Sequence, residues 1–429
     1  MKIGIIGAGF TGLTAGLRLS QAGHTVTIFE KDDKPGGLAV GYKEKEWDWT
    51  LEKHYHHWFT NDKSVLNLAK DLNYKVLSPR PKTSSFVENE IVQFDSPASL
   101  LKFSKLSLFE RVRMGISLAL LRYNKYWKPL EKYRAEKYLI NSMGQRAYGL
   151  LWEPLMKNKL GKYSYDVSLA WFWARIYKRT SSLAYPEGGF LRFAERIAHE
   201  IAQNKGEIYY NSEILNLESK DSPSVTYTNQ VHSKVKTEKF DAVIVTLPTS
   251  LFIKITPSLP KSYVVKNASL KNIAAVNTIL RLSKPLFTDG TYWLSMCDTQ
   301  SPILAVVEHT NFMDKKHYNN EHLVYLGNYL ETSDPRYAMT DKELLKLYDP
   351  WIKKINPEYT SSLIAYKTFH APFAQPIIYR NYSKNIPSRK TPLKNVYLAN
   401  IQQVYPWDRG TNYAVELGEK IAHEISKNR

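Results

Sequence analysis

Three glycines near the start of the chain have the spacing of a loop that binds a dinucleotide. Gly7, Gly9 and Gly12 form a G-x-G-x-x-G pattern directly after a short apolar run, residues 2–6. In such a loop the first glycine permits a tight turn, the second lets the backbone approach a pyrophosphate, and the third lets the next helix pack closely on the strand. Glu30 follows Gly12 by 18 residues. This is close to the roughly 20 residues expected for the acid that accepts hydrogen bonds from the adenosine ribose.

The elements that would position these residues can be read from the same stretch. Residues 2–6 predict a buried strand, residues 13–22 a helix closed by Gly23, and residues 24–29 a second strand. The N-terminus of that helix would offer free N–H groups and a positive dipole end to the phosphates. Strand, glycines, helix, strand and acid occur in register, which favours a bound dinucleotide over a glycine-rich packing turn.

The composition is that of an ordinary globular protein. The chain has 429 residues, 43% of them hydrophobic and 23% charged, which allows a large core and predicts two domains. Cys297 is the only cysteine, so intramolecular disulfides and thiolate metal clusters are excluded and the sequence suits a cytoplasmic location. Residues 3–17 are uncharged like a signal-peptide core, but the glycine pattern within them argues against one. No other uncharged stretch reaches the roughly 18 apolar residues of a spanning helix, so we expect no integral membrane segment.

The net charge favours anionic partners. The chain carries 59 basic and 41 acidic residues, a formal charge of +18. Such a surplus suits nucleic acid, anionic lipid headgroups or a phosphorylated substrate. The lysines are spread along the chain and form no run of five, so we do not expect nucleic acid as a partner. A generally basic, solvated surface explains the charge most simply.

A second glycine pair follows Glu30. Glu30, a short polar turn and Gly36-Gly37 resemble the FAD signature of the amine oxidase and protoporphyrinogen oxidase superfamily, which includes phytoene desaturases and UDP-galactopyranose mutases. The resemblance implies FAD as the tightly held cofactor. Many members have arginine directly after the pair, where this chain has Leu38. Transferred to this chain, the signature implies cofactor contacts from Gly7, Gly9, Phe10, Thr11, Gly12, Glu30, Lys31, Gly36, Gly37 and Leu38.

Later segments resemble the same superfamily. The stretch 185–190, Tyr-Pro-Glu-Gly-Gly-Phe, is similar to its Pro-x-Gly-Gly return into the FAD domain, and residues 395–414 are similar to its closing strand, loop and helix. In relatives that helix begins against the flavin pyrimidine ring, where its dipole would stabilise the charge of a reduced flavin. Relatives usually have Gly-Glu at positions 400–401, and we assign no role to Asp408 or Arg409. The implied cofactor contacts are Ile214 (adenine, through its backbone), Thr246, Asn400, Thr411, Asn412, Tyr413 and Ala414.

Residues 51–62 are dense in histidine and aromatic side chains. The run His57-Trp58-Phe59 resembles a segment of UDP-galactopyranose mutases and implies that His57 lies beside the isoalloxazine ring. A metal site is an alternative, because His54 and His56 would share one face of a strand. No third or fourth ligand can be placed, so we expect no metal. A plain aromatic core segment is a further alternative.

The remaining residues predict a substrate domain. Residues 61–184 read as mostly helical, including a helix at Ser64–Leu72 and a basic helix at Phe109–Tyr126 that could lie on a membrane surface. The basic side chains of the second helix are Arg111, Arg113, Arg122 and Lys125. Aromatic residues around Trp152 and Trp171 suit a pocket with the cation Arg175 beside it, although core packing explains them equally well.

The sheet of that domain is expected at residues 251–384, which read as alternating strands with one helix near 341–355. In amine-oxidising relatives a lysine of this region contacts flavin N5 through water. The resemblance places Asn277 at that position, which argues against amine oxidation.

The predicted fold is α/β, with a Rossmann-like FAD-binding domain built from residues 1–60, 185–250 and 385–429. An α+β substrate domain, residues 61–184 and 251–384, is inserted in it. The predicted function is an FAD-dependent oxidoreductase that transfers hydride from an organic substrate to flavin N5, with His57 and Arg175 as candidate catalytic residues.

Two other functions stay open. One is an isomerase similar to UDP-galactopyranose mutase that acts on a nucleotide sugar. The other is a flavin-bound protein with a binding or structural role. We expect a small-molecule substrate, anionic or lipophilic, and a cytoplasmic location that is compatible with peripheral contact to an anionic membrane. The sequence does not determine the substrate, the electron acceptor or the oligomeric state.

Overall fold

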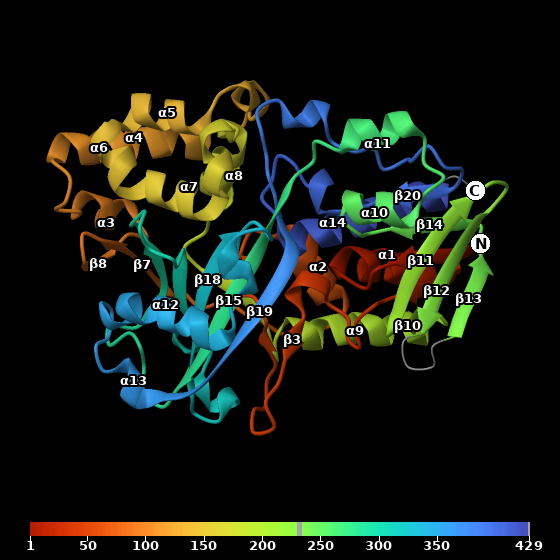
Figure 1. The fold of residues 1–429 in the computed structure, drawn as a ribbon, viewed down its shortest axis with the longest axis horizontal. Coiled ribbons are helices and arrows are strands. Elements are labelled where there is room, and N and C mark those ends of the chain that lie inside the picture. The colour runs from red at the N-terminus through yellow and green to blue at the C-terminus, as the bar shows by residue number, and fades with distance from the viewer. Residues whose placement is uncertain (230–233, 428–429) are drawn as a thin grey trace.

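A computed structural model describes residues 1–229 and 234–427. Two sheets organise these residues, one of five strands and one of seven. In Figure 1 the smaller sheet and its helices lie toward the two chain termini, and a separate group of helices, α3 to α8, lies beyond the larger sheet.

The smaller sheet is parallel throughout and is assembled from distant parts of the chain. Its strand order is β10-β2-β1-β14-β20, so β1 lies at the centre. All four residues of β14 are buried, as a parallel strand covered on both faces requires. The strands are β1 (Lys2–Ile6), β2 (Thr25–Phe29), β10 (Glu207–Tyr209), β14 (Ala242–Val245) and β20 (Val396–Leu398). This arrangement confirms the predicted α/β class with a Rossmann-like domain.

Three helices pack together on this sheet. Helix α1 (Phe10–Gln21) contacts both α9 (Phe190–Gln203) and α14 (Thr411–Lys427). The inner side of α14 is buried and includes Val415, Gly418, Ile421, Ala422 and Ile425. Gly418 allows the close approach, because a Cβ atom there would lie 2.6 Å from the carbonyl oxygen of Thr11.

A small antiparallel sheet adjoins β2. It consists of β11 (Ser212–Ser219), β12 (Pro223–Asn229) and β13 (Lys234–Lys239). Asn211 adopts a positive φ of 51° and separates β10 from β11. Two residues, Phe240 and Asp241, separate the end of β13 from β14.

The larger sheet has the order β19-β15-β18-β17-β16-β7-β8 and is antiparallel except for the pair β16–β7. Its long strands β15 and β19 run along the middle of the molecule (Figure 1). The strands are β7 (Lys82–Val87), β8 (Glu90–Gln93), β15 (Asn272–Leu282), β16 (Thr291–Met296), β17 (Ala305–Glu308), β18 (His322–Leu330) and β19 (Leu363–Pro376). Two-residue strands precede it, namely β3 (Gly41–Tyr42), β4 (Leu51–Glu52), β5 (Trp58–Phe59) and β6 (Val76–Leu77), and β5 and β6 pair with β9 (Leu183–Pro186).

Two predictions for this domain need correction. Residues 61–184 are mostly helical but also contribute β7 and β8 to the sheet. Strand β7 pairs with β8 across the two-residue turn Glu88-Asn89, in which both residues have a positive φ, and on its other side with β16, about two hundred residues later. The hairpin is a local feature that the expectation of helices overlooked, whereas local periodicity cannot reveal the pairing with β16. Residues 251–384 contain more than the one predicted helix, because α10 (Thr249–Ile255), α11 (Lys261–Asn267) and α13 (Tyr359–Ser362) accompany α12 (Asp341–Lys353). The three additional helices are short and lack the several turns that make a periodic pattern visible. Side chains of α10 and α11 pack into the core of the smaller sheet, so this part of the predicted substrate domain lies with the FAD-binding domain.

Within residues 61–184 the helices are α2 (Lys63–Asp71), α3 (Pro97–Leu101), α4 (Leu108–Tyr123), α5 (Ala135–Met143), α6 (Gln145–Ala147), α7 (Glu153–Leu160) and α8 (Leu169–Lys178). Of these, α2 packs against α14 of the FAD-binding domain. Among the described residues, none of the helices combines the length and the apolar character needed to cross a bilayer.

Candidate active site

The two glycine loops lie against each other at the end of β1. Gly9 forms a parallel bridge with Gly36, and the Gly36 amide donates to the carbonyl of Ala8 at 2.9 Å. A Cβ atom at Gly37 would lie 3.0 Å from Gly9 Cα, and one at Gly12 only 2.0 Å from the carbonyl oxygen of Gly7. These positions therefore require glycine for backbone packing alone.

The helix behind the loop begins with free donors. Gly9 is the N-cap of α1 and provides no side-chain cap, and Phe10 and Thr11 form the buried first turn. The first N–H groups of a helix have no intrahelical partner. Together with the helix dipole they suit an anion such as a pyrophosphate.

Glu30 closes the loop from the end of β2. Its carboxylate accepts hydrogen bonds from the amides of Ala8 at 2.7 Å and Asp32 at 3.0 Å. Burial raises the pKa of Glu30 above its ordinary value, against the lowering effect of these hydrogen bonds. The carboxylate thus lies beside the glycine loop, where the ribose of a dinucleotide is expected.

Two predicted cofactor contacts, Lys31 and Ile214, flank Glu30. The amide of Ser212 donates to the Glu30 carbonyl at 2.7 Å and so fixes the start of β11, which carries Ile214. Lys31 pairs with Glu213 at 2.9 Å on the exposed surface. Ile214 is therefore near the acid, whereas the Lys31 side chain is held by its neighbour.

Two further predicted contacts lie at the ends of β14 and β20. Thr246 Oγ1 donates to the carbonyl of Ile6 at 2.8 Å. A Cβ atom at Gly7 would lie 2.5 Å from Thr246 Oγ1. Asn400 is buried, and its amide donates to the carbonyl of Leu247 at 2.9 Å and to Thr249 Oγ1 at 3.1 Å. Thr246 therefore borders the glycine loop, and the Asn400 side chain joins the two strand ends.

The start of α14 is tied to the histidine-rich segment. Thr411 Oγ1 accepts a hydrogen bond from Trp58 Nε1 at 2.6 Å, and Asn412 Oδ1 accepts one from the amide of Val65 at 3.1 Å. Tyr413 stacks on Trp407 with ring centroids 5.9 Å apart. Ala414, the remaining predicted contact, packs against the main hydrophobic core.

A cavity of about 350 Å³ opens at this helix start. That volume is within the range of small-molecule sites. Both predicted catalytic residues, His57 and Arg175, line it, and so do Thr411, Asn412 and Tyr413. The structure thus brings together side chains that the sequence separates by more than two hundred residues.

His57 faces the cavity as a neutral imidazole. Its Nδ1 lies 3.2 Å from the hydroxyl of Tyr292, and its ring lies edge-on to Trp293 with centroids 6.1 Å apart. Burial, together with the charge of Arg179 and the neighbouring His56, lowers the pKa of His57 to about 3. The sequence did not indicate Tyr292, which comes from β16.

Arg175 stands over an aromatic ring and is paired with an acid. Its guanidinium carbon lies 4.2 Å from the centroid of Trp171, and its Nη2 lies 2.6 Å from Asp408 Oδ2. Asp408 therefore acts as the counter-ion of Arg175. Arg409 donates to Gln375 Oε1 at 3.0 Å and contacts the hydroxyl of Tyr329. The sequence left the roles of Asp408 and Arg409 open, and it gave no signal for Gln375 or Tyr329.

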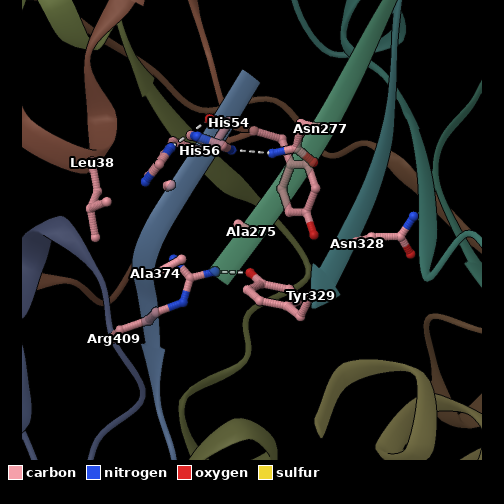
Figure 2. A pocket seen from close by; sticks show the side chains of 11 residues that line it. Leu38, His54, His56, Ala275, Asn277, Asn328, Tyr329, Ala374 and Arg409 are labelled. Carbon is pink, nitrogen blue, oxygen red and sulfur yellow. Dashed lines mark hydrogen bonds between the residues drawn. The ribbon is translucent and has the colours of Figure 1, made fainter. Parts of the chain in front are cut away.

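A small pocket adjoins the cavity and connects it to the second glycine loop. Figure 2 shows Leu38, which follows Gly37, facing the β15 residues Ala275 and Asn277 across this pocket. Arg409 lines both spaces. The pocket therefore lies between the cofactor loop and the cavity at the start of α14.

The histidines of the small pocket are held by hydrogen bonds within the protein. Asn277 Nδ2 donates to His54 Nδ1 at 2.5 Å, and His56 Nδ1 lies 2.6 Å from the His54 carbonyl oxygen (Figure 2). Burial lowers the pKa of His54 to about 3 and that of His56 to about 4. Within residues 1–229 and 234–427, no three His, Cys, Asp or Glu side chains are arranged to hold a metal ion.

Comparison with known proteins gives one family and several distant relatives. A family model for flavin containing amine oxidoreductases matches residues 10–422. Over 459 aligned positions the chain is 21% identical to 15-cis-phytoene desaturase from Synechococcus elongatus, covering 99% of this chain and 96% of the relative.

Solved structures share the fold at lower identity. Reduced UDP-galactopyranose mutase superposes with a TM-score of 0.77 at 15% identity. The alignment covers 100% of this chain and 96% of the mutase. Cyclohexylamine oxidase from Brevibacterium oxydans superposes with a TM-score of 0.73 at 15% identity. The alignment covers 100% of this chain and 99% of the oxidase. The names of these proteins describe different reactions, so the likeness shows a common fold and leaves the substrate open.

Proposed function

The chain belongs to the family of flavin-containing amine oxidoreductases, and from this premise we propose that it oxidises an organic substrate by hydride transfer to flavin N5. The family match confirms the predicted superfamily, an oxidoreductase enzyme and FAD as its cofactor. The observation that carries the proposal is the cavity at the start of α14, which joins His57 and Arg175 to the pocket beside the second glycine loop.

The residues of the glycine loops fit FAD. The free N–H groups at the start of α1 would hold the pyrophosphate, and Glu30 would accept from the ribose. The start of α14 would meet the flavin ring, where a helix N-terminus favours negative charge. The flavin supplies the redox chemistry when bound, and the protein supplies binding and orientation.

The side chains of the cavity would orient the substrate. His57 is neutral and hydrogen-bonded to Tyr292, so it can hold a polar group without adding charge. The Asn277 amide is engaged by His54, and no lysine stands at this position of β15. This supports a C–H oxidation other than that of an amine.

The test is the absorption spectrum of the purified protein before and after anaerobic mixing with candidate substrates. We expect flavin bands that bleach with an oxidisable compound and return when an acceptor is added. A protein without flavin bands, or one in which no compound from amine, polyene and sugar panels bleaches them, would contradict the proposal.

An isomerase acting on a nucleotide sugar is the second candidate. It is supported by His57, which lines the cavity and belongs to the segment that resembles the mutases, and by the cationic cavity wall. The same spectra separate the two candidates. If dithionite-reduced protein converts UDP-galactopyranose to its isomer while the flavin stays reduced, the oxidoreductase proposal is overturned.

We also propose that helix α4 contacts an anionic membrane surface. One side of α4 and the adjoining turn expose a row of apolar side chains, with Phe109 72% and Leu120 62% exposed. The exposed lysines Lys102, Lys125 and Lys128 flank this row. The members of the row, named the α4 apolar face, are Leu108, Phe109, Val112, Ile116, Leu120 and Tyr123. Apolar and basic side chains together suit anionic headgroups and the acyl boundary beneath them.

The arginines that were predicted to face a membrane from this helix bind backbone carbonyls of the protein instead. Arg111 donates to the carbonyl of Leu101, Arg113 to that of Ser142, and Arg122 to that of Ile176. Their guanidinium groups therefore fasten α4 to its neighbours. The groups of this region that would contact the membrane are therefore the α4 apolar face and the exposed lysines Lys102, Lys125 and Lys128.

A further inference from the structure

The cavity wall carries an excess of positive charge. Six basic and three acidic side chains line it. The basic ones are Arg80, Lys159, Lys178, Arg175, Arg179 and Arg409, and the acidic ones are Asp62, Asp95 and Asp408. A wall of this kind is poorly suited to a hydrocarbon, because charged groups are costly to cover with apolar surface.

Three of the cations lie close enough to repel one another. Lys159 comes from α7, Arg175 from α8, and Arg409 from the loop before α14. Burial and the charges of Arg175 and Arg409, opposed by Asp408, lower the pKa of Lys159 well below its ordinary value. Burial likewise lowers the pKa of Arg409 to about 10.

The protein itself supplies little compensation for these charges. Among the described residues, the only carboxylate within 4 Å of the three cations is Asp408, at Arg175. Lys159 lies over the rings of Tyr329 and Trp171, at 4.7 and 5.9 Å from their centroids. Arg175 Nε and Asp408 Oδ1 have no hydrogen-bond partner in the part of the chain that the structure describes.

FAD does not account for the surplus. Its pyrophosphate would lie at Gly7, Gly9 and the start of α1, and these residues are not part of the cavity wall. Arg409 also lines the small pocket, so its charge can face the flavin. Lys159 and Arg175 line the larger cavity and not the small pocket, so they face the space left for the substrate.

We propose that Lys159 and Arg175 bind a phosphate or diphosphate group of the substrate, with Arg179, which lines the same cavity, completing the site. This inference rests on the proposed function and adds a substrate class to it. Guanidinium groups bind phosphate through paired N–H donors, and a lysine adds a point charge. A single carboxylate would leave most of the surplus charge uncompensated, whereas a diphosphate carries enough charge to match it. His57 and Trp293 would then contact the part of the substrate that reacts.

The first experiment titrates the flavin-containing protein with inorganic pyrophosphate and measures the heat of binding. We expect Lys159→Gln and Arg175→Gln each to weaken binding at least tenfold, and Arg175→Lys to weaken it less. Lys157→Gln is the matched control, because Lys157 lies on the same helix but pairs with Glu153 at the surface. Unchanged flavin content and melting temperature would show that each variant is folded.

Proton uptake gives a second readout that a merely structural role would not produce. Burial and the neighbouring cations lower the pKa of Lys159, and an anion beside it should raise this pKa. Binding should therefore take up protons, detected as a difference in heat between buffers of unlike ionisation enthalpy. The uptake should disappear in Lys159→Gln. Equal affinity in wild type and both glutamine variants, or no binding by wild type at millimolar pyrophosphate, would overturn the proposal.

The last arm separates this inference from the proposed function. Pairs of compounds that differ only in a phosphate are compared as reductants of the flavin under anaerobic conditions. We expect loss of the phosphate to slow flavin reduction at least tenfold in wild type, and much less in Arg175→Gln. If the unphosphorylated member reduces the flavin equally well, the anion site is wrong and the oxidoreductase stands. If pyrophosphate binds at Arg175 but no compound reduces the flavin, the anion site stands and the oxidoreductase is wrong.

Discussion

His57 faces the cavity as a neutral imidazole. Because burial lowers its pKa, its environment can be tested through the pH dependence of stability. Burial lowers the pKa of His57 from the ordinary 6.5 to about 3. The folded protein thus disfavours the charged form, so His57 contributes stability that is present above pH 6.5 and is lost as the pH falls toward 3. Over that range the contribution changes by about 1.4 kcal/mol per pH unit.

His57→Ala should therefore change both stability and spectrum. We expect the free energy of unfolding to fall less steeply between pH 6.5 and 5 in the variant than in wild type, and the flavin absorption bands to shift. Denaturant titrations at several pH values and a visible spectrum measure these effects. His199→Ala, an exposed position, serves as the control. An unchanged spectrum in His57→Ala would place His57 away from the flavin.

Among the elements, α1 and α14 meet at a contact that only glycine allows. A Cβ atom at Gly418 would lie 2.6 Å from the Thr11 carbonyl oxygen and 2.8 Å from Thr14 Cβ. Gly418→Ala should therefore force the helices apart and cost about 1–3 kcal/mol, as overpacking usually does. Thermal unfolding and flavin content measure this. Gly115→Ala in α4 is the control, because its Cβ would meet only Leu100 at 3.5 Å. If both variants melt alike, the close approach is not important for stability.

The α4 apolar face makes a second prediction at this scale. Phe109→Ser combined with Leu120→Ser should abolish co-sedimentation with anionic vesicles, because these side chains would enter the lipid boundary. Wild-type binding should weaken at high salt, since screening shortens the reach of the lysine charges to roughly 8 Å near physiological ionic strength. Val265→Ser, which alters an apolar side chain exposed elsewhere, should have no effect. Absence of binding at low salt, or dimerisation that the double variant removes, would contradict membrane contact.

Elements whose cause is local could be predicted from the sequence, and those held by distant partners could not. The first strand and α1, the inner face of α14 and α12 follow from spacing and periodicity within one stretch. The β7–β8 hairpin has a local turn at Glu88-Asn89 and was overlooked, whereas the pairing of β7 with β16, about two hundred residues later, has no local signal. The same limit applies to the site. Gly9 and Glu30 carry a local pattern, whereas Lys159, Tyr292 and Tyr329 are ordinary residues until the fold brings them to one cavity.

The whole molecule is assembled around a sheet whose strands come from the start, the middle and the end of the chain. A ligand that touches all three parts stabilises only the folded state, and so raises the melting temperature by mass action. The predicted FAD contacts have this distribution, from Gly9 through Thr246 to Thr411. The cofactor and the fold should therefore be thermodynamically coupled.

Gly9→Val tests this coupling, because a Cβ atom at this position makes no close contact with the protein itself. A Cβ atom at Gly9 would lie 3.8 Å from its nearest neighbour, Gly37 Cα, and the φ angle of −70° suits any residue. The variant should fold, lose its flavin, and melt at the temperature of wild-type protein stripped of FAD. Added FAD should raise the melting temperature of stripped wild type but not of the variant. Glu30→Gln should retain FAD with weakened affinity, since it removes the charge beside the ribose and one of the two oxygens that accept from the amides of Ala8 and Asp32. Gly12→Ala is the contrasting case, because its Cβ would lie 2.0 Å from the Gly7 carbonyl oxygen and the fold itself should suffer. Full flavin occupancy in Gly9→Val would exclude this loop as the pyrophosphate site.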